Sequence, residues 1–355
     1  TLPPGLFTAL LTEGILPGLG GIVIFIPQIA FLFLFISILE ESGYMSRVVF
    51  LMDRGLRRFG LSGKSIIPLI SGTACAIPAV MATRNIENWK QRLITILVTP
   101  FTTCSARLPV YSILIALVIP QGHFLGMNYQ GLTLMALYLM GFGMALLASL
   151  VLNKVLDIKS KSYFVIEMPN YKLPLIKNVI LTVWEKSRTF VTEAGKIIMA
   201  ISILLWILAS YGPGESFKNA DIIIAKHYPL ISGEAKIQKI SAYKLEHSYI
   251  GLLGKFIEPA VTPLGYDWKI GIALIASFAA REVFVGTLAT IYNVENDADE
   301  TIKNRMAQET NAFGEPLFNL ASGISLMLFY AFAMQCMSTL AVVRRETKSW
   351  KWPVI

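Results

Sequence analysis

The residues best suited to chemistry in this chain are its three cysteines, Cys75, Cys104 and Cys336, which all lie within apolar stretches. A thiolate is a soft ligand that suits transition metals, and backbone carbonyls freed where a helix is interrupted add oxygen ligands. A buried cysteine can instead be a small apolar residue that fills space. Cys75 and Cys104 lie near helix-breaking residues and Cys336 is the counterpart of Cys104 in an internal repeat, which leaves a metal site and apolar packing as equal alternatives. The odd number of cysteines and their apolar surroundings argue against a disulfide framework.

Two pairs of charged residues lie at or inside apolar stretches. Glu40 and Glu41 end the first long stretch. Because carboxylates are rare in membrane segments, we expect them to attract a cation on its way in or out, with a simple interfacial role as the alternative. Arg281 and Glu282 interrupt a later stretch near its middle. Neighbours on a helix point in different directions, so we expect each to find a partner elsewhere, in an ion pair that joins two halves of the chain rather than as a ligand.

Other chemistry finds little support in the sequence. The segment 60–65 looks like a phosphate-binding loop, but Arg58 stands where the Walker A motif requires glycine. No nucleophile and base, and no pair of carboxylates, form a catalytic pattern. We therefore expect no enzymatic activity and no permanently bound cofactor. The net charge of +8 would suggest nucleic acid in a soluble protein, but basic loops facing anionic lipid explain it better, and no nucleic-acid partner is expected.

The elements that must position these residues are membrane helices. Of the 355 residues 54% are hydrophobic and only 15% are charged, and the mean hydropathy is +0.59, which favours a bilayer as the solvent. A helix needs about 20 apolar residues to cross the hydrocarbon core, where only helices and closed barrels satisfy the backbone. Apolar runs of helix length lie at 20–39, 92–119, 130–152, 189–211, 268–293 and 320–343, with a shorter run at 65–83.

The basic residues decide which of these runs cross the membrane. Arginine and lysine cluster in 47–64, in 84–92, in 153–188 and after residue 343, and all four clusters should be cytoplasmic. All four clusters lie on the cytoplasmic side if five runs cross the membrane and the other two, 65–83 and 268–293, enter and return on the same side. The alternative for these two runs is a kinked helix that spans the membrane.

Helix-breaking residues support an interruption in the run 65–83. Pro68, Gly72 and Pro78 break an α-helix and free backbone carbonyls, which is tolerated at membrane depth only where protein or a water-filled cavity covers them. Pro109 lies shortly after the second cysteine, Cys104, as Pro78 lies shortly after Cys75. We expect Pro78 and Pro109 to have structural or gating roles.

The two halves of the chain share a weak internal repeat. Residues 39–44 recur as 245–249 with one residue dropped, and residues 64–80 align with 269–285 at a constant offset. A third match, of 103–110 with 335–342, pairs Cys104 with Cys336. The topology above inserts the halves in opposite directions, which is the architecture of many secondary transporters. We therefore predict an all-α polytopic membrane protein, an inverted repeat of two gate-type halves with interrupted or re-entrant helices.

The predicted organisation has three parts. Residues 1–152 form the first half, with 130–152 as an additional helix. Residues 153–188 form a basic cytoplasmic linker. Residues 189–355 form the second half, with an extracytoplasmic insertion at 212–267.

Several motifs together resemble the bacterial ferrous iron transporter FeoB over nearly the whole chain. They lie at 25–29, 39–45, 52–54, 63–65, 75–78, 81–84, 104–111, 280–283 and 344–352. The resemblance implies import of Fe²⁺ across the bacterial inner membrane by a multi-pass protein. The cysteines of the two gate regions in this family map onto Cys75, Cys104 and Cys336.

The resemblance also implies partners. Members of this family carry an N-terminal GTPase domain and a helical regulatory domain, and this chain has neither, so GTP is expected only for the missing domain. Small cytoplasmic Feo-type accessory proteins are expected, and a homo-oligomer is an open option. Two other functions stay open. One is a transporter of a nucleoside-like molecule, and the other is a non-transporting membrane sensor or scaffold.

Overall fold

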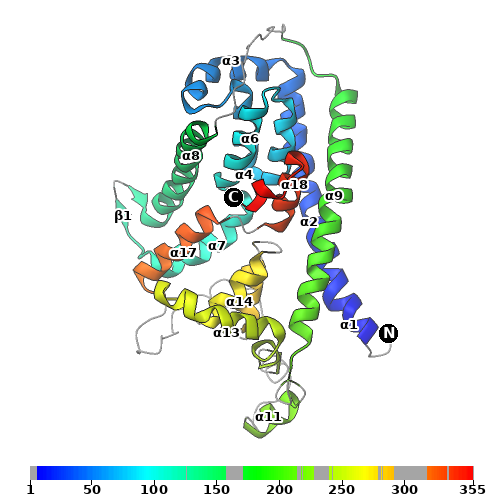
Figure 1. Ribbon diagram of the computed structural model, residues 1–355, viewed down its shortest axis with the longest axis vertical. Helices are drawn as coiled ribbons and strands as arrows, with labels where there is room; N and C mark the ends of the chain where they lie inside the picture. The colour runs from blue at the N-terminus through cyan, green and yellow to red at the C-terminus, as the bar shows by residue number, and fades with distance from the viewer. Residues whose placement is uncertain are drawn as a thin grey trace. The chain divides into compact units, whose positions relative to one another are not determined.

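The computed structural model describes residues 6–124, 126–156, 171–213, 217, 219–227, 240–241, 243–278, 281, 283–291, 318–333 and 336–354. The chain forms two compact units, each assembled from three stretches of sequence. Unit 1 comprises residues 1–18, 107–135 and 199–336, and unit 2 comprises residues 19–106, 136–198 and 337–355. Figure 1 shows the order of the helices along the chain.

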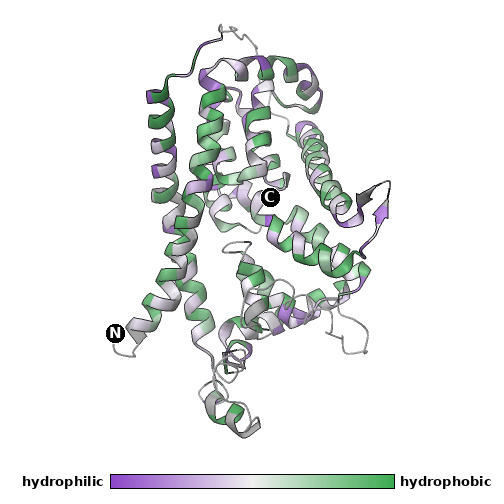
Figure 2. Cartoon of the chain, turned by 180° about the vertical axis from the view of Figure 1, so that it is seen from behind, coloured by the Kyte–Doolittle hydropathy of each residue, from purple (hydrophilic) through white to green (hydrophobic). Residues whose placement is uncertain are grey.

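Five helical segments of the described chain are long and apolar enough to cross a membrane, which confirms the five predicted spans. In Figure 2 hydrophobic residues cover much of these long helices. Two of the five segments contain an interruption. The five segments are Gly18–Glu41, Trp89–Val118, Tyr129–Val155, Ile176–Ser210 and Leu320–Thr347.

Unit 2 contains most of the short helices around the first two cysteines. Its helices, including long ones that continue from unit 1, are α2 (Leu16–Glu41), α3 (Tyr44–Leu56), α4 (Ile66–Ala74), α5 (Ala76–Ala82), α6 (Trp89–Val98), α8 (Tyr129–Val155), α9 (Ile176–Ser210), α18 (Met337–Thr347) and α19 (Lys351–Val354). Single 3₁₀ turns lie between them at η2 (Arg57–Phe59), η3 (Gly63–Ser65), η4 (Thr83–Asn85), η5 (Thr99–Phe101) and η6 (Ser105–Arg107), the last of which ends at the boundary with unit 1.

Unit 1 contains most of the short elements of the second half, together with three elements and a hairpin of the first half. They are α1 (Leu6–Ala9), the π-helical turn η1 (Leu10–Ile15), α7 (Leu108–Val118), α11 (Ala220–His227), α13 (Tyr249–Val261), η7 (Thr262–Leu264), α14 (Trp268–Ser277), α15 (Val283–Ile291) and α17 (Leu320–Phe332). The hairpin of β1 (His123–Phe124) and β2 (Met127–Asn128) is antiparallel, with His123 opposite Asn128. The α13 and α14 helices, drawn in yellow in Figure 1, pack against each other.

Two apolar clusters hold unit 2 together. The first, which we call the gate cluster, gathers side chains from α2, α5, α6, α9 and α18, and Cys75 packs against it. Its buried members are Ile29, Phe33, Ile77, Val80, Met81, Ile96, Phe190, Val342 and Val343. The second cluster joins α3, α4, α6 and α8 through Leu56, Leu61, Leu69, Ile94, Val98 and Ala145. The broken segments are therefore fixed by buried packing on both sides.

The run 65–83 is interrupted as predicted, but at a different residue. Pro68 and Pro78 are each the third residue of a helix, α4 and α5. In the first turn of a helix the backbone N–H has no intrahelical partner, so proline costs little there. The break falls between the two helices, at Cys75, and Gly72 lies inside α4. The run 268–293 is also divided, into α14 and α15, and part of the segment between them lies outside the described residues.

The internal repeat is visible in the secondary structure. α3 and α13 each have 13 residues and begin 205 residues apart, at Tyr44 and Tyr249. Each is followed by one 3₁₀ turn and by a glycine in the left-handed region, Gly60 with φ 78° and Gly265 with φ 83°. The N–H of Gly60 donates to the carbonyl of Arg57 at 3.0 Å, and the N–H of Gly265 donates to the carbonyl three residues earlier at 2.9 Å.

The repeat therefore extends further than the sequence matches suggested. The second copy of this helix and turn, at 249–266, lies in the range predicted as an extracytoplasmic insertion of the second half, 212–267. The predicted linker 153–188 is helical from Ile176 onward, because α9 begins there. The opposite orientation of the two halves stays a prediction.

Candidate metal centre

Cys75 lies in extended backbone between two short helices. α4 ends at Ala74 and α5 begins at Ala76, and Cys75 itself has φ −155° and ψ 131°. A continuous helix would satisfy the carbonyl of Ala74 with the N–H of residue 78, and Pro78 has none. The carbonyl of Ala74 instead accepts a hydrogen bond from the Ser105 hydroxyl at 2.9 Å. The interruption at Cys75 is thus stabilised by the side chain of Ser105, which lies in a second interruption of the chain.

Cys104 lies in the second interruption. The α6 helix ends at Val98, the turns η5 and η6 follow, and α7 begins at Leu108. Thr102 has ψ 133°, which ends the helical backbone after η5. Pro109 is the second residue of α7, a position at which proline favours the start of a helix. Cys104 is therefore placed on irregular backbone, as Cys75 is.

Ser105 joins the two interruptions. Its hydroxyl donates to the carbonyl of Ala74 and accepts a hydrogen bond from the side-chain amide of Gln28 in α2. Ala74 precedes Cys75 and Ser105 follows Cys104, so each cysteine is one residue from this hydrogen bond. Both cysteines are partly exposed and neither forms a disulfide. The structure thus brings Cys75 and Cys104 to one region of unit 2.

Two glycines allow the second interruption to approach its neighbours closely. A Cβ atom on Gly72 would lie 2.3 Å from Thr102 Oγ1. A Cβ atom on Gly141 of α8 would lie 2.9 Å from both the carbonyl oxygen of Phe101 and Thr103 Oγ1. The Thr103 hydroxyl is buried and has no hydrogen-bond partner among the described residues. A hydroxyl in this state beside Cys104 is a candidate oxygen ligand, because buried polar groups normally have a partner.

The residues joined by hydrogen bonds at Ser105 and their neighbours in the chain offer a mixed set of donors. They comprise two thiols, the hydroxyl of Thr103 and the amide oxygen of Gln28, whose nitrogen is the atom bonded to Ser105. Among the residues that the structure describes, no cluster of three or more His, Cys, Asp or Glu side chains could hold a metal ion.

Replacing Gly141 with alanine tests whether α8 holds the second interruption in place. The new Cβ would overlap the carbonyl oxygen of Phe101, a backbone atom that cannot move alone. We expect Gly141→Ala to destabilise the protein by about 1–3 kcal/mol, measured as a lower unfolding temperature in detergent. Gly143→Ala is the matched control two residues along the same helix, where an added Cβ meets nothing within 4 Å. The control should be neutral or slightly stabilising, and equal losses in both variants would contradict the close packing.

Cys336 lies in the corresponding interruption of the second half, between α17 and α18, and belongs to unit 1. Arg281, which is buried, supports this interruption from within unit 1. Its guanidinium donates to the carbonyls of Tyr330 at 3.2 Å and Ala333 at 2.9 Å, at the end of α17 where carbonyls have no helical partner. The predicted ion pair is not seen, since no described acidic side chain pairs with Arg281. Glu282 lies outside the described residues.

The helix after Cys336 packs in unit 2 against the helix after Cys75. Val342 and Val343 of α18 share the gate cluster with Val80 and Met81 of α5. The C-terminal ends of both helices meet, because Arg84, just beyond α5, pairs with the carboxylate near the end of α18. The two helices therefore run parallel.

Glu41 has structural partners in unit 2. Its carboxylate accepts hydrogen bonds from the backbone N–H of Leu175 at 3.2 Å and from the side-chain amide of Asn178 at 2.9 Å. These contacts place a negative charge at the N-terminus of α9, which is favourable for a helix dipole. Glu40 is exposed. Of the two, Glu40 is the better candidate to attract a cation.

The sequence alone did not single out Gln28, Thr103 and Ser105. Gln28 follows Pro27 inside the first apolar helix, and Ser105 follows Cys104 directly. A polar residue next to a proline or a cysteine in an apolar run was the signal that could have found them.

Five membrane-length helices, with interruptions that repeat between the halves, define a multi-pass α-helical membrane protein. The Gate family, described as nucleoside recognition, matches residues 22–117 and 191–350, and the ferrous iron transport protein B C terminus matches residues 134–186. The chain therefore belongs to the Gate family and corresponds to the C-terminal region of FeoB, which confirms the resemblance seen in the sequence.

Relatives over the whole chain support this assignment. The chain is 48% identical over 99% of its length to the Fe(2+) transporter FeoB of Leptospira interrogans, and 44% identical over 100% of its length to that of Leptospira biflexa. It is 37% identical over 99% of its length to the Fe(2+) transport protein A/Fe(2+) transporter FeoB fusion protein of Porphyromonas gingivalis. The chain spans 49%, 49% and 42% of these relatives. No solved structure matches it.

Proposed function

We propose that this chain is a membrane permease region that imports Fe²⁺ across the bacterial inner membrane. The observation that carries the proposal is the hydrogen-bonded junction at Ser105, which ties the irregular backbone of Cys75 to that of Cys104. Two soft ligands on joined helix breaks suit a transition-metal ion. The names of the relatives, Fe(2+) transporter FeoB, favour Fe²⁺ as that ion.

The ion is expected to exchange part of its water shell for protein ligands at this junction. Desolvating a divalent cation in a low dielectric is costly, so sulfur and oxygen donors must replace the water it loses. In this proposal Cys75 and Cys104 form the central site and Cys336 contributes from the second half. Glu40 attracts the ion at one mouth of the path, and Glu41 acts there mainly by fixing the start of α9.

The proposed topology keeps the two halves in opposite orientations, with 1–152, the linker 153–188 and 189–355 as its three parts. Pro78, Pro109 and Arg281 then act as structural parts of the gates, because they begin or cap the helices beside each interruption. A GTPase domain acting on the cytoplasmic loops is the expected driver or regulator of transport. A Feo-type accessory protein is a further expected partner, since the relative from Porphyromonas gingivalis is named as a fusion with Fe(2+) transport protein A.

The proposal is tested by flux into liposomes that contain the purified chain. We expect uptake of radiolabelled Fe²⁺ under reducing conditions, above the level of empty liposomes, and no uptake of labelled nucleosides. The same measurement with the full-length protein and GTP distinguishes an inactive permease from one that needs its driver. No Fe²⁺ flux in either preparation would reject the proposal.

A second candidate function follows from the family description, which reads nucleoside recognition. A nucleoside carrier should line its cavity with amides and aromatic rings to bind the base. Nucleoside uptake without Fe²⁺ uptake in the same liposomes would favour this alternative.

A further inference from the structure

A pocket of about 610 Å³ lies at the end of α5 and α18 in unit 2, apart from the cysteine junction. Four of its lining residues are cationic, and one carboxylate opposes them. Its walls are Arg84, Trp89, Arg92, Arg345, Glu346, Thr347 and Lys348. Four positive charges against one negative charge leave three in excess, which gives the pocket a positive electrostatic potential.

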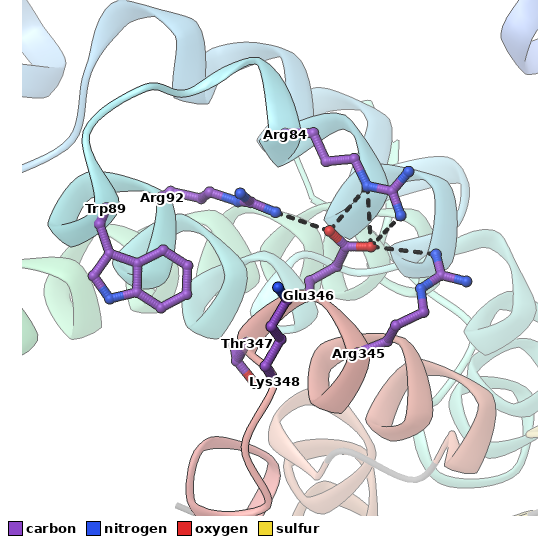
Figure 3. A pocket seen from close by; sticks show the side chains of 7 residues that line it. All are labelled: Arg84, Trp89, Arg92, Arg345, Glu346, Thr347 and Lys348. Carbon is purple, nitrogen blue, oxygen red and sulfur yellow. Dashed lines mark hydrogen bonds and ion pairs between the residues drawn. The ribbon is translucent and has the colours of Figure 1, made fainter.

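Glu346 engages only a part of the donors around it. Its carboxylate accepts from Arg84 Nε at 3.0 Å, from Arg92 at 2.8 Å and from Arg345 at 3.2 Å, as Figure 3 shows. A guanidinium carries five N–H donors in a fixed fork, and Arg84 uses those of Nε and Nη2 on Glu346. The side chain of Arg84 is 48% exposed. The donors of Arg84 that Glu346 does not engage can therefore reach a ligand in the pocket.

Two further observations indicate that the pocket is built to bind. The Nε–H of Arg92 is buried and has no hydrogen-bond partner in the described part of the chain. The ring centroid of Trp89 lies 5.8 Å from Cζ of the same guanidinium. Lys348 has φ 52°, and it is the one described residue other than glycine with a positive φ. The position after a helix C-terminus normally takes glycine because a side chain is strained there. A lysine at this place adds charge to the pocket at a cost in stability.

We propose that this pocket binds a phosphate group, supplied either by an anionic phospholipid or by a soluble phosphate compound. Forked guanidinium donors match phosphate oxygens, and arginine clusters are the usual means of binding them. The volume admits a phosphate group together with part of the molecule that carries it. This inference does not depend on the proposed transport of Fe²⁺.

The test is isothermal titration calorimetry of the full chain in a non-ionic detergent. One arm uses inorganic phosphate, the second uses short-chain phosphatidylglycerol, and acetate serves as the comparison anion. We expect saturable binding in at least one phosphate arm and none with acetate. Binding of inorganic phosphate alone assigns a soluble source, and binding of phosphatidylglycerol alone assigns the lipid headgroup. Absence of binding in both arms, or equal binding of acetate, overturns the proposal.

Lys348→Gly separates binding from folding. Glycine suits the left-handed backbone at this position, so the variant should keep the unfolding temperature of the wild type or exceed it. It should weaken phosphate binding about tenfold, because one charge-assisted hydrogen bond is lost. Arg58→Gln is the matched control, an exposed basic residue outside the pocket. An equal loss of affinity in the control, or no loss in Lys348→Gly, contradicts the assignment.

Discussion

Serine in place of both Cys75 and Cys104 should abolish Fe²⁺ uptake by the protein while leaving its fold intact. Serine is close to cysteine in size, but its hydroxyl is a hard donor and it does not form the soft thiolate bond that a transition metal prefers. The measurement is uptake of radiolabelled Fe²⁺ in cells that lack other iron importers, together with the unfolding temperature of each purified variant. The expected uptake of the double variant is that of cells with no transporter.

The single variants refine this prediction. Cys75→Ser and Cys104→Ser should each lower uptake strongly, because both thiols belong to the junction at Ser105. Cys336→Ser should have a smaller effect, since that cysteine belongs to the other unit. Uptake at the wild-type rate in the double variant would rule out the cysteine site. A large fall in its unfolding temperature would instead identify the thiols as packing residues.

Glu346→Gln should be among the most destabilising single substitutions in the chain. The carboxylate is only 4% exposed and pairs with three arginines. Removing its charge leaves these cations facing one another without a counter-charge, which for a buried pair costs about 3–5 kcal/mol. Because Arg84 and Arg345 are partly exposed and therefore screened by solvent, we expect the free energy of unfolding to fall by about 3 kcal/mol.

Glu87→Gln is the matched control for Glu346→Gln. The same chemical change is made there in a pair with Lys64, at a carboxylate that is 85% exposed. A surface ion pair is screened by solvent and contributes little to stability, so the unfolding temperature of the control should hardly change. Both unfolding temperatures are measured in the same detergent and salt. Similar shifts in the two variants would show that the arginine cluster does not stabilise unit 2.

The membrane spans could be predicted from sequence because the property that defines them is local. A run such as 130–152 is apolar over the length that a bilayer requires, whatever the rest of the chain does. The five crossing segments were therefore identified closely, and the structure extends them by a few residues at their ends, except for α9, which begins earlier. The repeat was found for a related reason, since both halves keep the same order of helix, turn and break.

The residues that hold the breaks together could not be predicted in the same way. Ser105 and the carbonyl of Ala74 are 31 positions apart, and Gln28 is 77 positions from Ser105. Pro68 and Pro78 were expected to interrupt a helix, but they begin helices, because the chain ends α4 where a long-range partner takes the freed carbonyl of Ala74.

The sequence by itself determined that this chain is a membrane protein, which of its described stretches are long and apolar enough to cross a bilayer, and that its cysteines lie in apolar stretches. Apolar length, charge and cysteine position are properties of short stretches. Only the tertiary structure decided that Cys75 and Cys104 share one junction, that Glu41 caps α9 and that Glu346 binds Arg84 from 262 positions away. In each case a donor and an acceptor that are far apart in the sequence form a hydrogen bond. The packing of the helices decides which of these distant groups meet.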